Sequence, residues 1–459
     1  MTDLRILAAS FFISASSAAA ECSIPHFQLP PSDPNTTTFE LSLDYPAAGS
    51  ELDSFSTETD FRSDWMGYLN EVLAYAFEGN LENDFVVQDN SIRSWFHTPW
   101  LHAGHSGREY VHGLTRERSS RPNELQNGVD AFFQNWGVGF YNEAAAGTLG
   151  AIWTDFCNPS VDALADVDFP EGSVSFKVLF TAASEAEIDA LEGAPTWTAH
   201  IHTQGPPCRR EDPCPREERT VTLLQIDVAI KDRRATDTGW VFGTFVYDKR
   251  LSHLAPWERL VPISIGWGND PEVEPEEPLF ENIINEDFDG VFFGWDARPH
   301  MGWNGRANGP VDNPISSCVS CHGTAQFPRS DTFANILPSR LTLTDSEIRR
   351  VYFQNIRGGS LFDPDVVPRP PFQSDLVVPV ALDYSLQTQL GLEQLCFAWI
   401  DSRPPFDTVA SKPAVCPSRQ PEAESLAAFR TMGLTEAQMA PLERFLGDIR
   451  DEPVSKDNN

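Results

Sequence analysis

Two cysteines and a histidine stand close together at residues 318–322, which read Cys-Val-Ser-Cys-His. Thiols three positions apart lie on the same side of a helical turn, and the adjacent imidazole can serve as a metal ligand. This is the spacing at which two thiols attach a haem through its vinyl groups while the histidine ligates the iron. We therefore expect one covalent haem c, held by Cys318, Cys321 and His322.

Redox dithiols and half-sites for zinc use the same cysteine spacing. No thioredoxin-like pattern of strands and helices surrounds this pair, however, and no second Cys/His pair lies at zinc-finger distance. Haem attachment is therefore the favoured interpretation. On Cys318, Cys321 and His322, together with the helical segment that follows, the last third of the chain resembles c-type cytochromes.

The resemblance also implies what lies opposite the histidine. In c-type cytochromes the other iron ligand is commonly Met or His, and no histidine except His322 follows His300. Small members place a methionine in the loop before their last helix, which points to Met432. Met439 falls on the apolar stripe of the expected helix at 435–449 and is assigned to the core. A different or absent ligand stays open, because Met432 is farther from His322 than in compact members.

A second concentration of chemistry lies at residues 95–113. It contains Arg108, Glu109 and four histidines: His97, His102, His105 and His112. Converging imidazoles can bind zinc, copper or iron, but this irregular spacing matches no closed metal motif. Hydrogen bonding within aromatic loops is therefore favoured, and a metal site or substrate pocket stays an alternative. The basic patch that follows, at 115–122, is expected to pack through salt bridges.

Strands are expected mainly before the Cys-Val-Ser-Cys-His pentad at residues 318–322, and helices mainly after it. Alternating or continuous apolar runs predict strands at 174–180, 197–201, 221–230, 239–247 and 259–267. Helical spacing predicts helices at 64–77, 344–356, 384–399 and 435–449. The spacing of the strands is that of an antiparallel sandwich or jelly roll.

The expected fold class is α+β and multidomain. A β-rich, sandwich or jelly-roll-like domain at 21–268 is followed by an acidic linker or loop at 269–299, whose charge and prolines resist packing. Residues 300–459 are expected to form a mainly α, cytochrome c-like haem domain.

Residues 1–20 have the apolar stretch and small terminal residues of a secretory signal peptide, so a periplasmic or secreted protein is expected. No other stretch has the length and apolar character of a membrane span. Six cysteines outside the pentad suit disulfides in an exported protein. Plausible pairs are Cys22–Cys157, Cys208–Cys214 and Cys396–Cys416, and other pairings stay open.

Acidic residues dominate the charge: 67 Asp and Glu against 33 Lys and Arg give a net charge of −34. Such a field repels phosphate backbones and anionic lipid, which excludes nucleic acid as a partner. It favours a basic redox partner protein or a saline habitat, and the sequence does not choose between them.

The favoured function is an exported monohaem cytochrome that transfers electrons, because no catalytic triad or nucleotide-binding loop is recognisable. Two alternatives stay open. One is a single-haem peroxidase or oxygenase whose β-rich domain forms the substrate pocket. The other is a β-sandwich ligand-binding protein with an accessory haem domain. A dihaem peroxidase is disfavoured, because the chain has one attachment motif.

Substituting the expected sixth ligand tests this assignment. In Met432→Ala we expect the weak near-infrared absorption of sulfur-ligated ferric haem to disappear, because alanine offers no thioether to the iron. Absorption spectra of the oxidised protein measure this, with Met439→Ala as the matched control. An unchanged spectrum in Met432→Ala would assign the ligand elsewhere.

Overall fold

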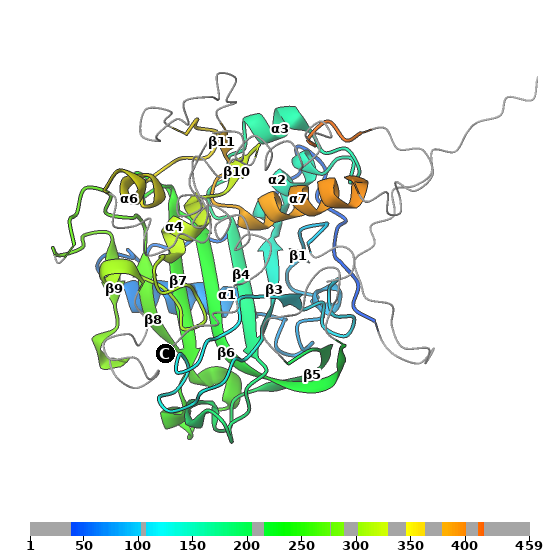
Figure 1. The fold of residues 1–459 in the computed structure, drawn as a ribbon. Helices are drawn as coiled ribbons and strands as arrows, with labels where there is room; N and C mark the ends of the chain where they lie inside the picture. Colours follow the sequence, from blue (N-terminus) through cyan, green and yellow to red (C-terminus); the bar gives the residue numbers. More distant parts are fainter. Residues whose placement is uncertain are drawn as a thin grey trace, which may run out of the picture.

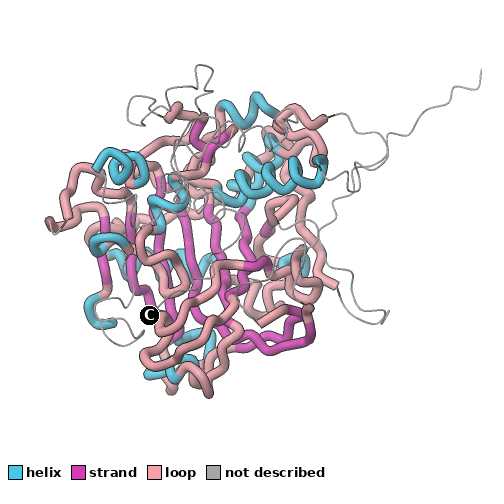
Figure 2. Tube along the Cα trace, in the orientation of Figure 1, coloured by secondary structure: helices cyan, strands magenta, loops and turns pink. Residues whose placement is uncertain are grey.

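An antiparallel sheet of nine strands forms the centre of the molecule (Figures 1 and 2). The structure is a computed structural model. It describes residues 38–101, 107–203, 215–275, 277–288, 302–328, 346–362, 379–400 and 412–416. A large β-rich, antiparallel architecture is therefore confirmed.

Five strands of this sheet were expected from the alternation of side chains, namely β4 to β8. The strand bounds are β1 (Trp95–Phe96), β2 (Thr115–Arg116), β3 (Asn135–Asn142), β4 (Val174–Thr181), β5 (Thr196–Ile201), β6 (Glu217–Lys231), β7 (Trp240–Tyr247), β8 (Leu260–Gly266) and β9 (Asn282–Ile284). The strand order is β1-β3-β4-β6-β7-β8-β9, with β2 also paired to β3 and β5 to β6.

The expected sandwich or jelly roll differs from what the described residues form. Besides the large sheet they contain one small sheet, β10 (Gln326–Phe327) with β11 (Val380–Ala381). Helices and loops cover the faces of the large sheet where a sandwich would place a second sheet (Figure 1). Alternation of apolar and polar side chains along a strand indicates that one face is buried, but it does not identify the element that covers this face.

Helix α1 (Trp65–Phe77) packs on one face of the sheet, at the position predicted from helical spacing. Asp64 caps it, because its Oδ1 accepts a hydrogen bond from the backbone N–H of Gly67 at 3.0 Å. Leu69 lies directly over Gly243 on β7, where an added Cβ would come within 2.4 Å of a Leu69 methyl group. The main apolar core, rich in aromatic rings, fills this face.

The other described helices lie on the opposite face or at its edge (Figure 1). They are α2 (Glu143–Ile152), α3 (Val161–Ala165), α4 (Cys318–Gly323), α6 (Ser346–Tyr352) and α7 (Leu386–Ile400). Short 3-10 turns occur at Val87–Asp89, Asp189–Leu191, Lys249–Leu251, Pro256–Arg259, Glu286–Phe288 and Trp303–Gly305.

The predicted helix at 384–399 is α7, and the one predicted at 344–356 ends earlier, at Tyr352. Helices α2 and α3 are absent from the sequence-based predictions. Their caps, Asn142 and Ser160, accept hydrogen bonds from backbone N–H groups three residues on. The helix predicted at 435–449 lies outside the described residues.

A bulge in β6 changes which of its side chains share a face. Leu179 pairs with Gln225, whereas Phe180 pairs with Leu223, so Leu224 is the extra residue. Simple alternation groups Val221 and Leu223 with Gln225 and Asp227. The bulge instead places the first two in the core beside α1 and turns Gln225 and Asp227 to the other face.

The acidic segment after β8, expected to be a linker or a long loop, contains a strand of the sheet. Ile284 of β9 pairs with Ser264 of β8, and Arg306 donates hydrogen bonds to the carbonyl groups of Asn269 and Asp270. Backbone pairing and a buried guanidinium hold this part of the segment against the sheet, despite its charge. The domain boundaries at 268, 269–299 and 300 stay a prediction.

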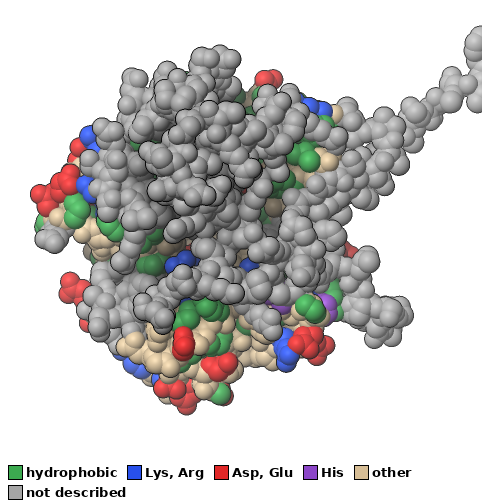
Figure 3. All heavy atoms as spheres, viewed as in Figure 1, with side chains coloured by type: hydrophobic (Ala, Val, Ile, Leu, Met, Phe, Trp, Pro, Cys, Tyr) green, Lys and Arg blue, Asp and Glu red, His purple; other side chains and the backbone are tan. Residues whose placement is uncertain are grey.

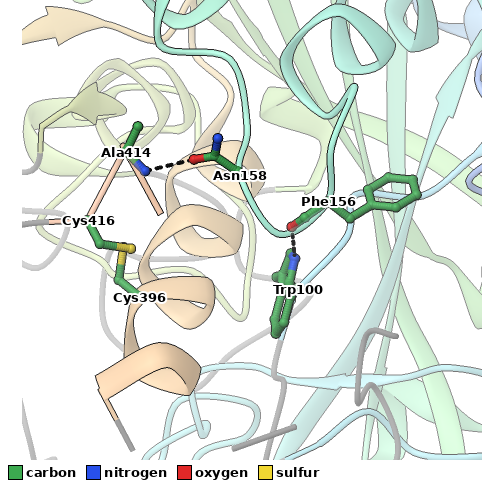
Figure 4. Close-up of a disulfide and its surroundings, with 6 residues drawn as sticks. All are labelled: Trp100, Phe156, Asn158, Cys396, Ala414 and Cys416. Atoms are coloured by element: carbon green, nitrogen blue, oxygen red, sulfur yellow. Dashed lines mark hydrogen bonds between the residues drawn. A yellow bond between two sulfur atoms is a disulfide. The ribbon is translucent and has the colours of Figure 1, made fainter. Parts of the chain in front are cut away.

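A disulfide joins Cys396 on α7 to Cys416, with an S–S distance of 2.06 Å (Figure 4). This confirms one expected pair. The backbone N–H of Ala414 donates to Asn158 Oδ1 at 2.8 Å, so the disulfide also links α7 to the loop after α2. The other predicted pairs include cysteines outside the described ranges and stay predictions: Cys22–Cys157 and Cys208–Cys214.

Helices in the described ranges are too short or too polar to cross a membrane. The proposed signal peptide, residues 1–20, lies outside these ranges.

The close approach of α1 to β7 gives a stability prediction. Gly243→Ala is expected to lower the free energy of unfolding by about 1–3 kcal/mol, because the new methyl group overlaps Leu69. Leu69→Ala alone is expected to cost about 2–5 kcal/mol through a cavity. In the double variant the added methyl group partly fills that cavity, so urea titrations should show a combined loss smaller than the sum. Additive losses would contradict this packing.

Candidate functional site

The Cys-Val-Ser-Cys-His pentad forms α4, a six-residue helix whose position is set by its N-terminal cap. Ser317 Oγ accepts from the N–H of Ser320 at 2.9 Å, and Ser320 Oγ accepts from the N–H of Ser317 at 2.8 Å. Ser317 Oγ also donates to Asn269 Oδ1, and the N–H of Cys318 donates to the carbonyl of Ala307. These bonds attach the start of α4 to the loops beside β8.

Both cysteines of α4 remain thiols and are half-buried. Removal from water raises the pKa of Cys318 well above its usual range and that of Cys321 to about 12, and the charge of Asp312 adds to both shifts. The thiols are therefore protonated at neutral pH. Cys318 Sγ lies 3.9 Å from the hydroxyl of Thr244 on β7, so this thiol lies against the sheet.

His322 is oriented by a hydrogen bond to the backbone. Its Nδ1 lies 2.9 Å from the carbonyl oxygen of Tyr384, which can only accept, so Nδ1 carries the proton. Nε2 of the neutral ring then carries the lone pair. Burial lowers the pKa of His322, which favours this neutral form. The ring packs against Phe242 of β7 at a centroid distance of 5.0 Å.

A buried ion pair holds the turn that presents the Tyr384 carbonyl. Asp383 Oδ2 accepts from Lys231 Nζ at 2.7 Å and from the N–H of Phe169 at 2.7 Å, while Oδ1 accepts from Trp240 Nε1 at 2.9 Å. Asp383 and Tyr384 both have positive φ, 46° and 63°, which non-glycine residues rarely adopt. The buried contacts of Asp383 keep the turn in this conformation.

Beside α4, polar side chains cross the face of the sheet in one row. Lys177 on β4 pairs with Asp227 on β6, which pairs with Thr244 on β7. Asp227 Oδ1 accepts from the Thr244 hydroxyl at 2.8 Å. Gln225 Nε2 lies 2.9 Å from Asp227 Oδ2 and 3.3 Å from Asp312 Oδ2, so one amide bridges two carboxylates.

The middle of this face is accessible while its surroundings are buried. Lys177, Asp227, Cys318 and Cys321 are half-buried, whereas Thr244 between them is buried. The row is therefore not fully sealed from solvent.

The charge of Asp312 affects the proton affinity of Asp227 in the row. Removal from water raises the pKa of Asp227 to about 7, and the charge of Asp312 adds to the shift. Lys177 offsets part of this, but its Nζ lies 2.6 Å from Glu117 Oε2 and forms an ion pair there. The row therefore holds a carboxyl group that can gain or lose a proton near neutral pH.

In its described residues, the histidine-rich segment contributes hydrogen bonds and aromatic contacts to the fold. His97 is fully buried and its Nδ1 accepts from the N–H of Ser42 at 2.9 Å; His112 stacks on Trp197 with centroids 4.3 Å apart. Glu109 Oε2 accepts from the N–H of His112 at 2.7 Å. In the part of the chain that the structure describes, no cluster of three or more His, Cys, Asp or Glu side chains could hold a metal ion. The other two histidines lie outside the described ranges: His102 and His105.

The donor set of α4 fits a covalent haem. Two neutral thiols stand one helical turn apart, and one imidazole has its Nδ1 proton engaged and its Nε2 lone pair left for iron. Half-burial of both thiols leaves them reachable. The predicted ligand Met432 lies outside the described residues, as does Met439, so the opposite ligand stays a prediction.

Several residues of the site are absent from the sequence-based prediction. Gln225 and Asp227 did carry a signal, because they are polar in a strand otherwise apolar on both faces. Lys231, Asp383 and Asp312 carried none, since each meets its partner only through contacts that span long stretches of chain. In the basic patch, Arg118 pairs with Glu124 and Glu117 with Lys177, as the salt-bridge interpretation predicts.

Comparison of the chain with known protein families, with characterised proteins and with solved structures finds no match.

The buried ion pair of the Tyr384 turn gives a second stability prediction. Lys231→Met is expected to lower the free energy of unfolding by about 3–5 kcal/mol, because it leaves Asp383 buried without its cation. The loss should shrink as the pH falls, since burial raises the pKa of Asp383 and protonation removes the uncompensated charge.

The matched control is Lys249→Met, whose pair with Glu192 is exposed and 3.3 Å long, with an expected loss below about 1 kcal/mol. Denaturant titrations at several pH values measure both variants. Equal losses in the two would refute the anchoring role of Lys231.

Proposed function

We propose that this chain is an exported electron-transfer protein that carries one covalent haem c on Cys318, Cys321 and His322. The observation that carries the proposal is the hydrogen bond from His322 Nδ1 to the Tyr384 carbonyl, beside two thiols on one helical turn. With Nδ1 protonated, Nε2 of the neutral ring carries the lone pair that would bind iron. In this proposal residues 300–459 are the mainly α, cytochrome c-like part, and the protein is periplasmic or secreted.

The two thiols supply the attachment. Each S–H adds across one vinyl double bond of the porphyrin, with sulfur bonding one carbon and hydrogen the other, so no oxidant is consumed. Because Cys318 and Cys321 are protonated at neutral pH, they match the thiol form that this addition needs. When bound, haem supplies a one-electron ferric/ferrous couple. His322 would hold the iron, and Met432 is the proposed second ligand.

The surface charge supports a protein partner with a basic docking surface. The net charge of −34 raises the encounter rate with cations and repels nucleic acid. In Figure 3, groups of Asp and Glu side chains are visible along the left and lower edges of the face that carries α4 and α7 in Figure 1. A redox partner of opposite charge would dock by long-range attraction that salt weakens.

The attachment is tested by mass and by substitution. Protein matured in a host with haem-attachment machinery is expected to keep the mass of one haem after denaturation. Cys318→Ala with Cys321→Ala should lose it, because no thiol remains to form a thioether. Val319→Ala is the matched control in the same helix and should retain the added mass.

Absence of any added tetrapyrrole in the wild type would refute the proposal. Electron transfer, as opposed to haem enzymology, further requires an occupied sixth position, so ferrous protein should bind carbon monoxide slowly or not at all. Rapid binding would instead favour a peroxidase or oxygenase.

A further inference from the structure

Two carboxylates beside α4 do not take part in haem attachment, yet the fold brings them close to it: Asp227 on β6 and Asp312 in the loop before α4. Asp227 and Asp312 accept hydrogen bonds from the single amide nitrogen of Gln225. The hydroxyl of Thr244 links this pair to the attachment helix, since it donates to Asp227 and lies 3.9 Å from Cys318 Sγ. The negative charge of Asp312 acts to raise the pKa of both thiols and of His322.

We propose that the Asp227–Asp312 pair is a proton acceptor that takes up one proton from solvent when the haem site accepts one electron. This inference rests on the proposed function. The electron comes from a donor redox protein, the proton goes to a carboxylate oxygen of the pair, and both return when an acceptor protein removes the electron. Each electron transferred would then be accompanied by one proton, although the electron and the proton follow separate routes.

The physical reason is electrostatic. An added electron makes the attachment site more negative by one charge, and in the poorly solvated space beneath α4 that charge repels the nearby carboxylates strongly. Protonating one member of the pair removes the repulsion. Burial and repulsion from Asp312 make Asp227 hold its proton more tightly than a free carboxyl group does, so this proton exchanges near neutral pH instead of at about pH 4.

Other charged and titratable groups around the pair do not substitute for it. Lys177 faces Asp227 from β4 but is paired with Glu117. The thiols of α4, Cys318 and Cys321, are consumed as thioethers when haem is attached. Asp227 is half-buried, so it is not fully sealed from solvent.

The test measures the midpoint potential of the haem-loaded protein against pH. In the wild type the potential should fall as pH rises through neutrality, with a slope approaching about 59 mV per pH unit, the one-electron equivalent of a tenfold change in proton activity. Asp227→Asn should flatten the slope. Asp312→Asn should move the sloping region to lower pH, because Asp227 loses its repelling neighbour.

The control is Asp232→Asn, in the residue that follows β6. Arg234 holds the pKa of Asp232 below its usual value, so this carboxylate stays ionised and the slope should be unchanged. A slope in Asp227→Asn equal to that of the wild type, in protein that carries haem, would overturn the proton coupling while leaving the electron-transfer proposal intact. Protein without covalent haem would overturn both.

A second measurement needs no haem. In the Cys318→Ala, Cys321→Ala background, the free energy of unfolding should fall as pH rises between about 4 and 7, because the folded state binds a proton at Asp227 that the unfolded chain has released. Adding Asp227→Asn should reduce that dependence, and the remainder comes from other buried carboxyl groups whose pKa is raised, such as Asp383. Identical pH dependence with and without Asp227→Asn would overturn the assignment of the proton to this pair.

Discussion

The ion pair between Lys231 and Asp383 connects the two parts of the structure on which the site depends. Lys231 ends β6 in the middle of the sheet, whereas Asp383 belongs to the turn before α7. A buried carboxylate is stable only when its hydrogen-bonding capacity is met, and here donors from β6, β7 and the loop before β4 meet it together. The next carbonyl in the chain orients His322. The direction of the imidazole is therefore set by the sheet, through one charged contact.

Both faces of the sheet carry an apolar core, and one of them also carries the row of polar side chains. On the face covered by α1, aromatic and branched side chains form a continuous core. On the other face, a row of charged and polar side chains lies half-buried beside the two thiols. Charges placed there oppose folding unless they are compensated. The apolar cores on the two faces can offset that opposition, which allows Lys177, Asp227 and Asp312 to remain in the row.

The polar row also shows what a β-rich scaffold offers to a site of charged side chains. A strand ladder holds side chains of neighbouring strands at set spacings, so Asp227 and Thr244 keep their separation whatever happens at α4. Charged groups held in fixed positions stabilise a charge at the site more strongly than water does, because water dipoles must first reorient. The cap of α4 on Ser317 and Asn269 extends the same rigidity to the cysteines.

Local patterns in the sequence were enough to identify the Cys-Val-Ser-Cys-His pentad. They also predicted strands β4 to β8, helices α1 and α7, and the Cys396–Cys416 disulfide. These features depend on residue types and spacings within one segment, or on the short separation between two cysteines. The expected sandwich or jelly roll was not found in the described residues, and the strand within the acidic segment was not predicted. Alternation of side chains indicates that a face is buried, but it does not identify the element that covers it. Only the tertiary structure decided that Leu224 bulges, that Asp227 meets Asp312 and that Asp383 meets Lys231. Those contacts join residues far apart along the chain, and their free energy depends on burial that exists only once the whole sheet has formed.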